Sequence, residues 1–368
     1  MEKFHVDLGD RGYPIYIGSE NLKLLGKKLR ENFPDQRKIL LATDANVDKI
    51  YTSLLQKNLE KSDFEVTKIV VSPGEATKNL EKTANFFDRL VENNFARDSI
   101  VLSLGGGVVG DLAGFAAATY MRGINFIQVP TSLLAQVDSS VGGKVAVNHP
   151  QGKNLIGAFY QPEMVYMDVS VLKTLPDREF KAGMAEVIKH GFGLDEEYFK
   201  YIKNHSEEIL SYDYKVLTRM ILRSCQIKKK IVEQDEKEKG ERAKLNLGHT
   251  IAHALETVYD YNKINHGEAV ALGMVVESYL AKYEGIIDQN VIDELVNLLK
   301  SMELPISLSP GVSGKNLIKM MQSDKKIRRG KVQMALPQKI GSTVLFRDWS
   351  QDKLLKAIKT VTESNLIE

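Results

Sequence analysis

The chain has 368 residues, which exceeds one ordinary core and is enough for two domains of roughly 150–200 residues each. Its 50 Lys and Arg against 48 Asp and Glu leave a formal net charge of +2, and this balance argues against a nucleic acid or a membrane surface as the partner. The single cysteine, Cys225, cannot form an intrachain disulfide, the first residues lack the apolar core of a signal peptide, and no uncharged apolar run reaches the ~20 residues of a membrane helix. We therefore expect a soluble, cytoplasmic protein.

The first half of the chain alternates apolar runs with amphipathic stretches. Two segments, 4–8 and 13–17, flank a Gly-Asp-Arg-Gly sequence and predict a hairpin at the edge of a sheet. Five short apolar runs then predict buried strands: 38–42, 68–71, 99–104, 126–129 and 164–168. Helix-like segments such as 79–93 lie between them. Strands that alternate with helices predict parallel pairing, as in a doubly wound α/β sheet.

The second half reads differently, because apolar residues recur there at helical spacing. The predicted helices are 179–191, 195–212, 214–232, 250–259, 267–284 and 291–302. One late alternating pair, 331–336 and 342–346, predicts a further hairpin. This half is therefore expected to be mainly helical.

A glycine-rich stretch follows the predicted strand at 99–104. Gly105, Gly107 and Gly110 match a G-x-G-x-x-G spacing, and a small-residue helix is predicted at 112–119. Glycine lets a phosphate approach the backbone closely, and a helix N-terminus presents free N–H groups to it. The stretch is therefore a candidate pyrophosphate site, although an ordinary strand-to-helix turn explains it equally well.

Polar residues follow other predicted strands. Asp44 comes after the strand at 38–42, residues 73–78 place a carboxylate and an amine after the next strand, and Thr131 and Ser132 follow the strand at 126–129. An open α/β sheet binds its ligand at the carboxyl ends of its strands, and a carboxylate there bonds ribose hydroxyls. These segments favour a bound nucleotide.

Histidines gather late in the chain. His249 and His253 are four residues apart and share one face of a predicted helix, and His266 opens another helix. Glu186 lies in an apolar segment, where a carboxylate needs a partner. Two histidines and one carboxylate would leave an open position, as catalytic zinc requires. An i, i+4 histidine pair alone is not diagnostic, but nearby polar residues favour a functional site: Arg242, Asn246 and Glu256.

Taken together, these residues resemble the dehydroquinate synthase family. The similar stretches follow one another along the chain: 105–123, 128–149, 152–162, 183–191, 242–256 and 266–274. Ala252 stands where the family commonly has glycine, a change that a helix should tolerate. The resemblance implies an α/β, Rossmann-like N-terminal domain with a mainly parallel sheet (1–177), which binds NAD. A mainly α-helical C-terminal domain (178–368) follows, which binds metal and substrate, with the active site in the cleft between the domains.

The resemblance also implies roles for individual residues. Zinc would be held by Glu186, His249 and His266. Contacts with NAD are implied for Pro73, Gly74, Glu75, Ala76, Thr77, Lys78, Gly107, Val108, Val109, Gly110, Asp111, Thr131, Ser132, Lys144, Lys153, Val171, Leu172, Lys173 and Thr174, to which Asp44 is added from its place after a strand. Catalytic roles are implied for Lys144, Lys189, Arg242, Asn246 and His253. Substrate contacts fall on Arg122, Asp138, Asn154, Lys228, Arg242 and either Lys325 or Lys326.

The implied reaction converts 3-deoxy-D-arabino-heptulosonate 7-phosphate (DAHP) into 3-dehydroquinate and phosphate, a step of aromatic amino acid biosynthesis by the shikimate pathway. NAD oxidises a hydroxyl transiently, phosphate is eliminated, the hydride returns, and an intramolecular aldol step closes the ring. Cobalt is the alternative metal, and a homodimer is implied. Other hypotheses remain open: a cyclase for another sugar phosphate, or a metal-dependent polyol dehydrogenase that consumes NAD. A non-enzymatic nucleotide sensor would have no use for the histidine cluster.

Overall fold

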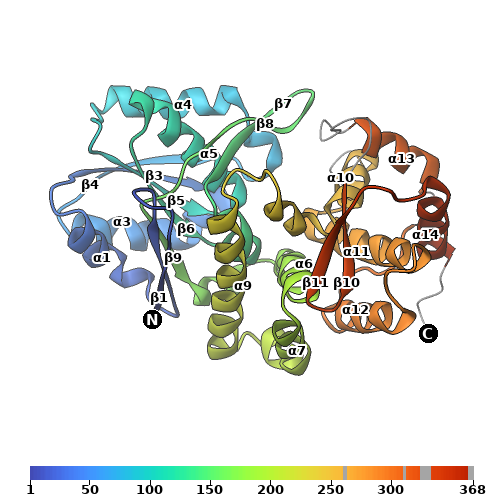
Figure 1. Ribbon diagram of the computed structural model, residues 1–368. Helices are drawn as coiled ribbons and strands as arrows, with labels where there is room; N and C mark the ends of the chain where they lie inside the picture. Colours follow the sequence, from blue (N-terminus) through green and yellow to red (C-terminus); the bar gives the residue numbers. More distant parts are fainter. Residues whose placement is uncertain (260–262, 310–311, 324–332, 364–368) are drawn as a thin grey trace. The chain divides into compact units, whose positions relative to one another are not determined.

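The computed structural model describes residues 1–259, 263–309, 312–323 and 333–363 (Figure 1). The chain divides into two compact units, Met1–Pro176 with Leu217–Lys229 and Asp177–Val216 with Lys230–Glu368. The long helix α9 (Tyr214–Gln234) therefore contributes its middle to the first unit and its ends to the second. Within the described ranges, no helix combines the length and the apolar character needed to cross a membrane.

A mostly parallel sheet forms the centre of the first unit. In the described part of this unit, seven strands pair in the order β1-β2-β9-β6-β5-β3-β4, and only β1 runs antiparallel to its neighbour. The bounds are β1 (Glu2–Val6), β2 (Tyr13–Gly18), β3 (Lys38–Asp44), β4 (Glu65–Val71), β5 (Ile100–Gly105), β6 (Asn125–Pro130) and β9 (Met164–Asp168). The edge hairpin and the five strands predicted from the sequence are confirmed. The run 68–71 is not a fully buried strand as predicted, because β4 lies at the edge of the sheet and Val70 is 39% exposed.

Helices cover both faces of this sheet (Figure 1). Leu40 and Ala42 point to one face, in the core formed with α4 (Leu80–Glu92) and α5 (Gly107–Thr119). Ile39 and Leu41 point to the other face, in the core formed with α1 (Leu25–Asn32) and α3 (Ser53–Glu60). Successive side chains of a strand alternate between faces, so a continuous apolar run, like Ile39–Ala42 of β3, requires a core on each side.

Two features of the first unit differ from the sequence-based prediction. Helix α5 begins at Gly107 rather than at 112, so Gly107–Asp111 form its first turns and the loop before them is shorter than expected. An antiparallel ribbon, β7 (Lys144–His149) with β8 (Gly152–Phe159), was not predicted. Strand β8 has no fully buried residue, so it lacks the apolar run that marked the strands of the sheet.

Short elements complete the first unit. These are α2 (Ala45–Val47), the 3₁₀ helices η1 (Leu22–Leu24), η3 (Glu75–Thr77), η4 (Tyr120–Arg122) and η6 (Val169–Thr174), and the π-helical segments η2 (Asp48–Thr52) and η5 (Ala135–Ser139). Most of them follow a strand or helix directly, where the sequence-based prediction had only loops.

The second unit is mainly helical, as expected. Its helices are α6 (Asp177–Leu194), α7 (Glu196–Asn204), α8 (Ser206–Leu210), α10 (His249–Val258), α11 (His266–Tyr283), α12 (Gln289–Ser301), α13 (Gly314–Ser323) and α14 (Gln351–Glu363), with the 3₁₀ helix η7 (Glu241–Asn246) and the hairpin β10 (Met334–Lys339) and β11 (Ser342–Phe346). The helix predicted at 195–212 is two helices, because the backbone leaves helical geometry at His205. Helices α13 and α14 were not predicted.

Helix α11 forms the centre of the second unit. It packs against α6, α10, α12 and α14, and almost all of its residues from Gly267 to Ala281 are buried. A helix that is apolar on all sides belongs in such a place. The two helices that matter most for the site, α6 and α10, both rest on it.

Candidate metal centre and nucleotide-binding residues

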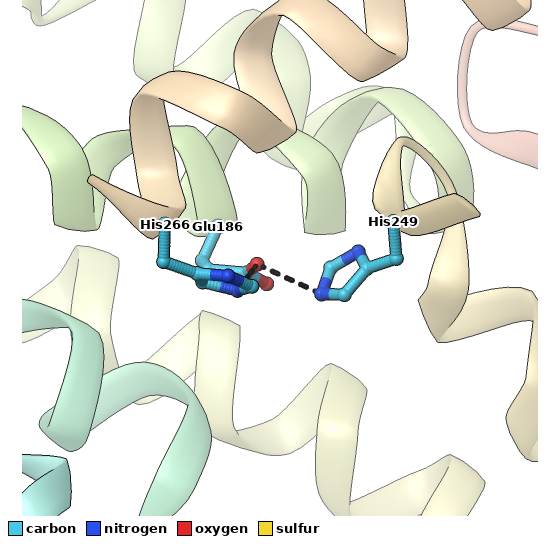
Figure 2. Close-up of side chains that lie close together, drawn as sticks. All are labelled: Glu186, His249 and His266. Carbon is cyan, nitrogen blue, oxygen red and sulfur yellow. Dashed lines mark ion pairs between the residues drawn. The ribbon is translucent and has the colours of Figure 1, made fainter. Parts of the chain in front are cut away.

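Three side chains from separate helices of the second unit converge in one cluster (Figure 2). Glu186 lies within α6, His249 is the first residue of α10, and His266 is the first residue of α11. Glu186 Oε1 lies 3.4 Å from His249 Nε2 and 3.6 Å from His266 Nε2. One donor atom from each of the three residues lies within 4.8 Å of the others.

Local sequence explains why each histidine opens its helix. Asn265 caps α11 by accepting a hydrogen bond from Glu268 N, and the Glu268 side chain accepts one from Asn265 N, which is a complete capping box. At α10 the capping residue is Gly248, whose φ of +82° is a backbone conformation that favours glycine. Glu277 of α11 accepts a hydrogen bond of 2.5 Å from Gly248 N. Burial raises the pKa of Glu277 well above its usual value, and the backbone hydrogen bonds that its side chain accepts at the start of α10 offset only part of this rise.

Two glycines of α11 let the three helices approach closely. A Cβ atom at Gly267 would lie 1.9 Å from the carbonyl oxygen of Ala182 on α6, one turn before Glu186. A Cβ atom at Gly273 would lie 1.9 Å from the carbonyl oxygen of Gly248, next to His249. Both contacts are made with backbone atoms, so any larger residue would push these helices apart.

The charge of Glu186 is balanced by basic neighbours. Its side chain is fully buried and forms an ion pair with Lys189, which is 2% exposed and lies one turn further along α6. Burial acts to raise the pKa of Glu186, but the positive charge of Lys189 and the contacts with the rings of His249 and His266 outweigh it and hold the pKa well below its usual range. Glu186 is therefore ionised in the folded protein.

The two histidines differ in their preferred protonation. Burial and the nearby charge of Lys189 hold the pKa of His249 well below its usual value, so this ring is neutral. Burial also acts to lower the pKa of His266, but Glu186 and Glu256 lie on either side of the ring and raise it to about 10. A cation that binds the cluster therefore has to displace a proton from His266.

The donor set fits a divalent metal ion of the zinc type. Both carboxylate oxygens of Glu186 are buried, and the groups that face them are Lys189 at one oxygen and the two histidine rings at the other. The Nε2 atoms of both histidines face the same oxygen, Glu186 Oε1. Two imidazoles and one carboxylate are a ligand set of catalytic zinc sites, in which a fourth position is left for water or substrate.

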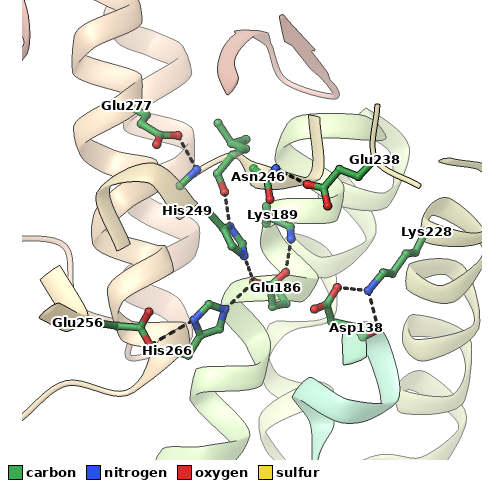
Figure 3. A network of polar contacts seen from close by, with 12 residues as sticks. Asp138, Glu186, Lys189, Lys228, Glu238, Asn246, His249, Glu256, His266 and Glu277 are labelled. Atoms are coloured by element: carbon green, nitrogen blue, oxygen red, sulfur yellow. Dashed lines mark hydrogen bonds and ion pairs between the residues drawn. The ribbon is translucent and has the colours of Figure 1, made fainter. Parts of the chain in front are cut away.

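Further predicted residues lie in the same unit. His253 follows His249 by one turn of α10, and the centroids of these two rings are 5.7 Å apart. Arg242 is 2% exposed and donates from Nη1 to the carbonyl oxygen of Glu236 at 2.5 Å. Asn246 donates from Nδ2 to Glu238 Oε1 at 2.8 Å (Figure 3).

The loop that carries Arg242 is organised by one carboxylate. Asp235 accepts hydrogen bonds from the backbone N–H groups of Lys239, Gly240 and Arg242 at 2.8, 2.7 and 3.2 Å. Burial acts to raise the pKa of Asp235, but these three donors lower it below its usual value. Neither Asp235 nor Glu238 was among the predicted site residues, because their partners are decided by the course of this loop.

In the first unit, most of the predicted nucleotide-binding residues lie at the carboxyl ends of parallel strands. They are Asp44 at the end of β3, Pro73–Lys78 after β4, Gly107–Asp111 after β5, Thr131 and Ser132 after β6, and Val171–Thr174 after β9. Helix α5 begins at this edge, and its capping residue Gly106 has no side chain to satisfy the free N–H groups. An anionic diphosphate is a suitable partner for such a helix end. The carboxylate of Asp44 instead accepts hydrogen bonds from Asn46 N and Val47 N, which caps α2.

Several of these residues form one polar network around Lys78. Lys78 is 4% exposed, and its Nζ lies 2.5 Å from Asp111 Oδ2 and 2.5 Å from Asn154 Oδ1. Burial raises the pKa of Asp111, and Lys78 offsets only part of that effect. The sequence analysis missed Asn148, which donates to Glu75 Oε1 at 2.7 Å and accepts from Asn154 N at 2.9 Å. Its partner Glu75 is 73 positions away, so no local pattern marks it.

The other predicted residues are placed as follows. Lys228 of α9 donates to the carbonyl oxygen of Asp138 at 2.6 Å and also contacts its carboxylate. Arg122 is exposed at the end of η4 and has a positive φ of 70°. Lys144 opens β7 and Lys153 lies in β8. Lys325 and Lys326 lie outside the described residues.

Comparison with known proteins identifies the family. The family described as 3-dehydroquinate synthase N-terminal matches residues 68–182, and that described as 3-dehydroquinate synthase C-terminal matches residues 183–327. A curated 3-dehydroquinate synthase of Desulforamulus reducens is 46% identical over 97% of this chain and 99% of its own length. One of a Shewanella species is 44% identical over 97% of this chain and 99% of its own.

Several solved structures of other proteins share the fold of this chain. A 2-epi-5-epi-valiolone synthase from Streptomyces hygroscopicus, with NAD+ and Zn²⁺ bound, is 25% identical with a TM-score of 0.87 over 95% of this chain and 96% of that one. A 2-deoxy-scyllo-inosose synthase is 24% identical with a TM-score of 0.88 over 98% and 100%. A glycerol dehydrogenase from Schizosaccharomyces pombe has a TM-score of 0.68 at 17% identity, over 94% and 88%. From the two matched family domains and the full-length relatives, the chain belongs to the 3-dehydroquinate synthase family.

Proposed function

We propose that this chain is an enzyme that converts DAHP into 3-dehydroquinate and phosphate, with NAD and one divalent metal ion as cofactors. Its full-length relatives at 44–46% identity carry that activity in their names, and both family domains are present in order. The observation that carries the proposal is the cluster of the buried Glu186 with the partly buried His249 and His266, because two histidines and one carboxylate are a ligand set of catalytic zinc sites.

The two halves of the chain would have different functions. Residues 1–177 would bind NAD, and residues 178–368 would bind the metal and the substrate. When bound, NAD would take up and return a hydride, and zinc, or cobalt as the alternative, would polarise the substrate's oxygen atoms. The solved 2-epi-5-epi-valiolone synthase with NAD+ and Zn²⁺ bound supports this pair of cofactors.

The chain's own residues would bind and orient the metal, the substrate and NAD. Glu186, His249 and His266 would hold the metal, and Lys189 would keep Glu186 ionised. Arg242 would offer a buried guanidinium to an anionic group of the substrate. Further contacts with NAD and substrate are proposed for the residues implied by the family resemblance, including Lys144, Lys153, Asp138, Asn154, Lys228, Asn246, Arg122 and His253.

The free N–H groups at the start of α5 would receive the diphosphate of NAD. Gly106 and Gly107 add no side chain there, and a Cβ atom at Gly107 would lie 3.1 Å from Ser139 Oγ. Asp111 in the first turns of this helix, and Lys78 paired with it, would bond further polar groups of the cofactor. Asp44 would need to rotate away from its cap on α2 before it could bond ribose hydroxyls.

A related activity is the alternative. The similar folds of 2-epi-5-epi-valiolone synthase and 2-deoxy-scyllo-inosose synthase favour a cyclase for another sugar phosphate as the second candidate. A polyol dehydrogenase is less well supported, because the glycerol dehydrogenase has only 17% identity. The substrate assay separates these activities.

The test is phosphate release from DAHP by zinc-loaded protein with catalytic NAD, with absorbance of NADH followed in the same sample. The proposal predicts phosphate in large excess over NAD and no accumulation of NADH. Absence of phosphate release from DAHP would contradict it and favour a different sugar phosphate, and steady NADH formation with a polyol would favour the dehydrogenase.

The metal centre has its own test. His249→Ala should lose the metal and the activity while keeping the circular dichroism spectrum, because only a ligand is removed. His205→Ala is the matched control, since His205 stacks on Tyr201 at the end of α7 and should leave the metal in place. A His249→Ala protein that retains zinc and turnover would remove His249 from the ligand set.

Two further expectations stay predictions. Assembly as a homodimer is checked by light scattering after size-exclusion chromatography, and a cytoplasmic location by cell fractionation.

A further inference from the structure

The two histidines of the metal cluster are supported in parallel ways. Each directs Nε2 at Glu186 Oε1, at 3.4 Å for His249 and 3.6 Å for His266. Each has an oxygen on the opposite side of the ring, at Nδ1. For His249 this is the backbone carbonyl oxygen of Leu247 at 3.2 Å, and for His266 it is Glu256 Oε1 at 3.6 Å (Figure 3).

The position of Glu256 separates it from the three proposed ligands. It lies on α10 seven positions after His249, so both side chains project from the same side of that helix. It is 5% exposed, and a carboxylate so buried requires a partner. The ring of His266 lies between Glu256 and Glu186, because one carboxylate faces Nδ1 and the other faces Nε2. Glu256 therefore contacts the cluster through His266.

We propose that Glu256 is the positioning residue of His266: its carboxylate accepts the Nδ1 proton and so presents the Nε2 lone pair to the metal. This inference rests on the metal centre of the proposed function. Metal-bound histidines commonly donate their second ring N–H to a carboxylate or a carbonyl oxygen, which sets the tautomer, orients the ring and makes the bound nitrogen more basic.

The inference explains why one histidine has a carboxylate partner and the other a carbonyl. The turn at Gly248 brings the carbonyl oxygen of Leu247 to the ring of His249 within the same short segment. His266 opens a different helix, and its own capping residue, Asn265, is engaged with Glu268. The acceptor for its Nδ1 is supplied instead by α10, which packs against α11. The pair therefore also joins the two helices that carry the histidine ligands.

The experiment measures zinc affinity of the full chain by competition with a chromophoric chelator, and records the visible spectrum of the cobalt-loaded protein. Glu256→Ala should weaken zinc binding by roughly 10–100-fold, the usual effect of losing such a partner. Glu256→Gln keeps an acceptor oxygen without the charge and should lose less. Glu241→Gln is the charge control, because Glu241 is exposed and pairs only locally with Lys244 among the described contacts.

A double variant separates positioning from a general structural role. If Glu256 acts through His266, then Glu256→Ala should weaken binding no further in a His266→Ala background. Thermal unfolding of every variant shows whether it is folded, and Glu256→Gln, which preserves shape, serves if Glu256→Ala does not fold.

Three outcomes decide the question. Zinc affinity and cobalt spectrum unchanged in Glu256→Ala and Glu256→Gln would overturn the inference, as would additive losses in the double variant. If His266→Ala itself binds zinc like the unmodified protein, then the proposed metal centre fails. If His266→Ala weakens binding and the Glu256 variants do not, only the role of Glu256 fails.

Discussion

Replacement of Gly267 by alanine tests how the fold positions the metal centre. The added Cβ atom would lie 1.9 Å from the carbonyl oxygen of Ala182, 2.5 Å from its carbonyl carbon and 2.6 Å from its Cα. These are backbone atoms of α6, so no side-chain rotation relieves the overlap. Non-bonded carbon contacts are optimal at about 3.5–4.0 Å, so α11 and α6 must separate locally by roughly 1 Å or more.

The separation should affect stability and metal binding together. Overpacking typically costs about 1–3 kcal/mol, and the better helix propensity of alanine opposes it by at most about 1 kcal/mol, so a net loss of about 2 kcal/mol is expected for a backbone overlap this severe. His266 precedes Gly267 and moves with it relative to Glu186. Metal–ligand distances tolerate only about 0.2 Å, so zinc affinity should fall at least about tenfold.

The assay is urea unfolding of the metal-free protein together with zinc competition at a temperature where all variants are folded. Gly314→Ala is the control, because a Cβ atom there would meet the ends of flexible side chains, the nearest being Leu355 Cδ2 at 3.2 Å. It should leave zinc affinity unchanged. If Gly267→Ala keeps both the unfolding free energy, within about 0.5 kcal/mol, and the zinc affinity of the unmodified protein, then the close helix contact does not position the cluster.

Other contacts give predictions of their own. Lys78→Met should lower the free energy of unfolding by about 3–5 kcal/mol, because Asp111 keeps a buried charge without its partner. The double variant Lys78→Met with Asp111→Asn should recover much of that stability without restoring NAD binding. Urea unfolding measures the stability of both variants, and titration with NAD measures their binding. Glu277→Ala should lower the free energy of unfolding by about 1–3 kcal/mol, because Gly248 N loses its acceptor, and Glu277→Gln should lower it less. Equal losses of stability for the two variants in thermal unfolding would contradict this account. Because the pKa of Asp235 is lowered in the folded protein, this residue contributes stability that is complete above its unfolded pKa of about 3.9. That stability is lost as the pH falls through the lower pKa of the folded protein, so Asp235→Asn should make the free energy of unfolding depend less on pH in acid. An unchanged dependence below pH ~4 would contradict this prediction.

Much of the first unit could be predicted because its signals are local. The strand predicted at 38–42 is apolar at every position from Ile39 to Ala42, so it had to lie in a sheet covered on both faces, and β3 does. Strand β8 carried no such signal. Its residues are exposed or half-buried, and within the described residues the strand pairs with β7 alone, so a ribbon outside the main sheet left no apolar run to recognise.

The extent of α5 shows a limit of local patterns. Two of the five residues from 107 to 111 are glycines, which have low intrinsic helix propensity, so a turn was the better prediction from the sequence. In the structure these residues are helical, and Val109 and Gly110 are buried against the core and strand β6. Tertiary packing overcame the local preference.

The sequence by itself determined the alternation of strands and helices, the placement of polar residues after parallel strands, and the shared helix face of His249 and His253. These follow from spacing along the chain, since a periodic pattern has only one matching geometry. Only the tertiary structure decided that Glu186, which pairs with Lys189, meets two histidines from other helices. It also decided that Glu256 faces His266, and that Lys78 pairs with Asp111 and Asn154. Those contacts depend on how closely helices pack, down to the bare backbone at Gly267 and Gly273, and the spacing of residues along the chain does not specify that distance.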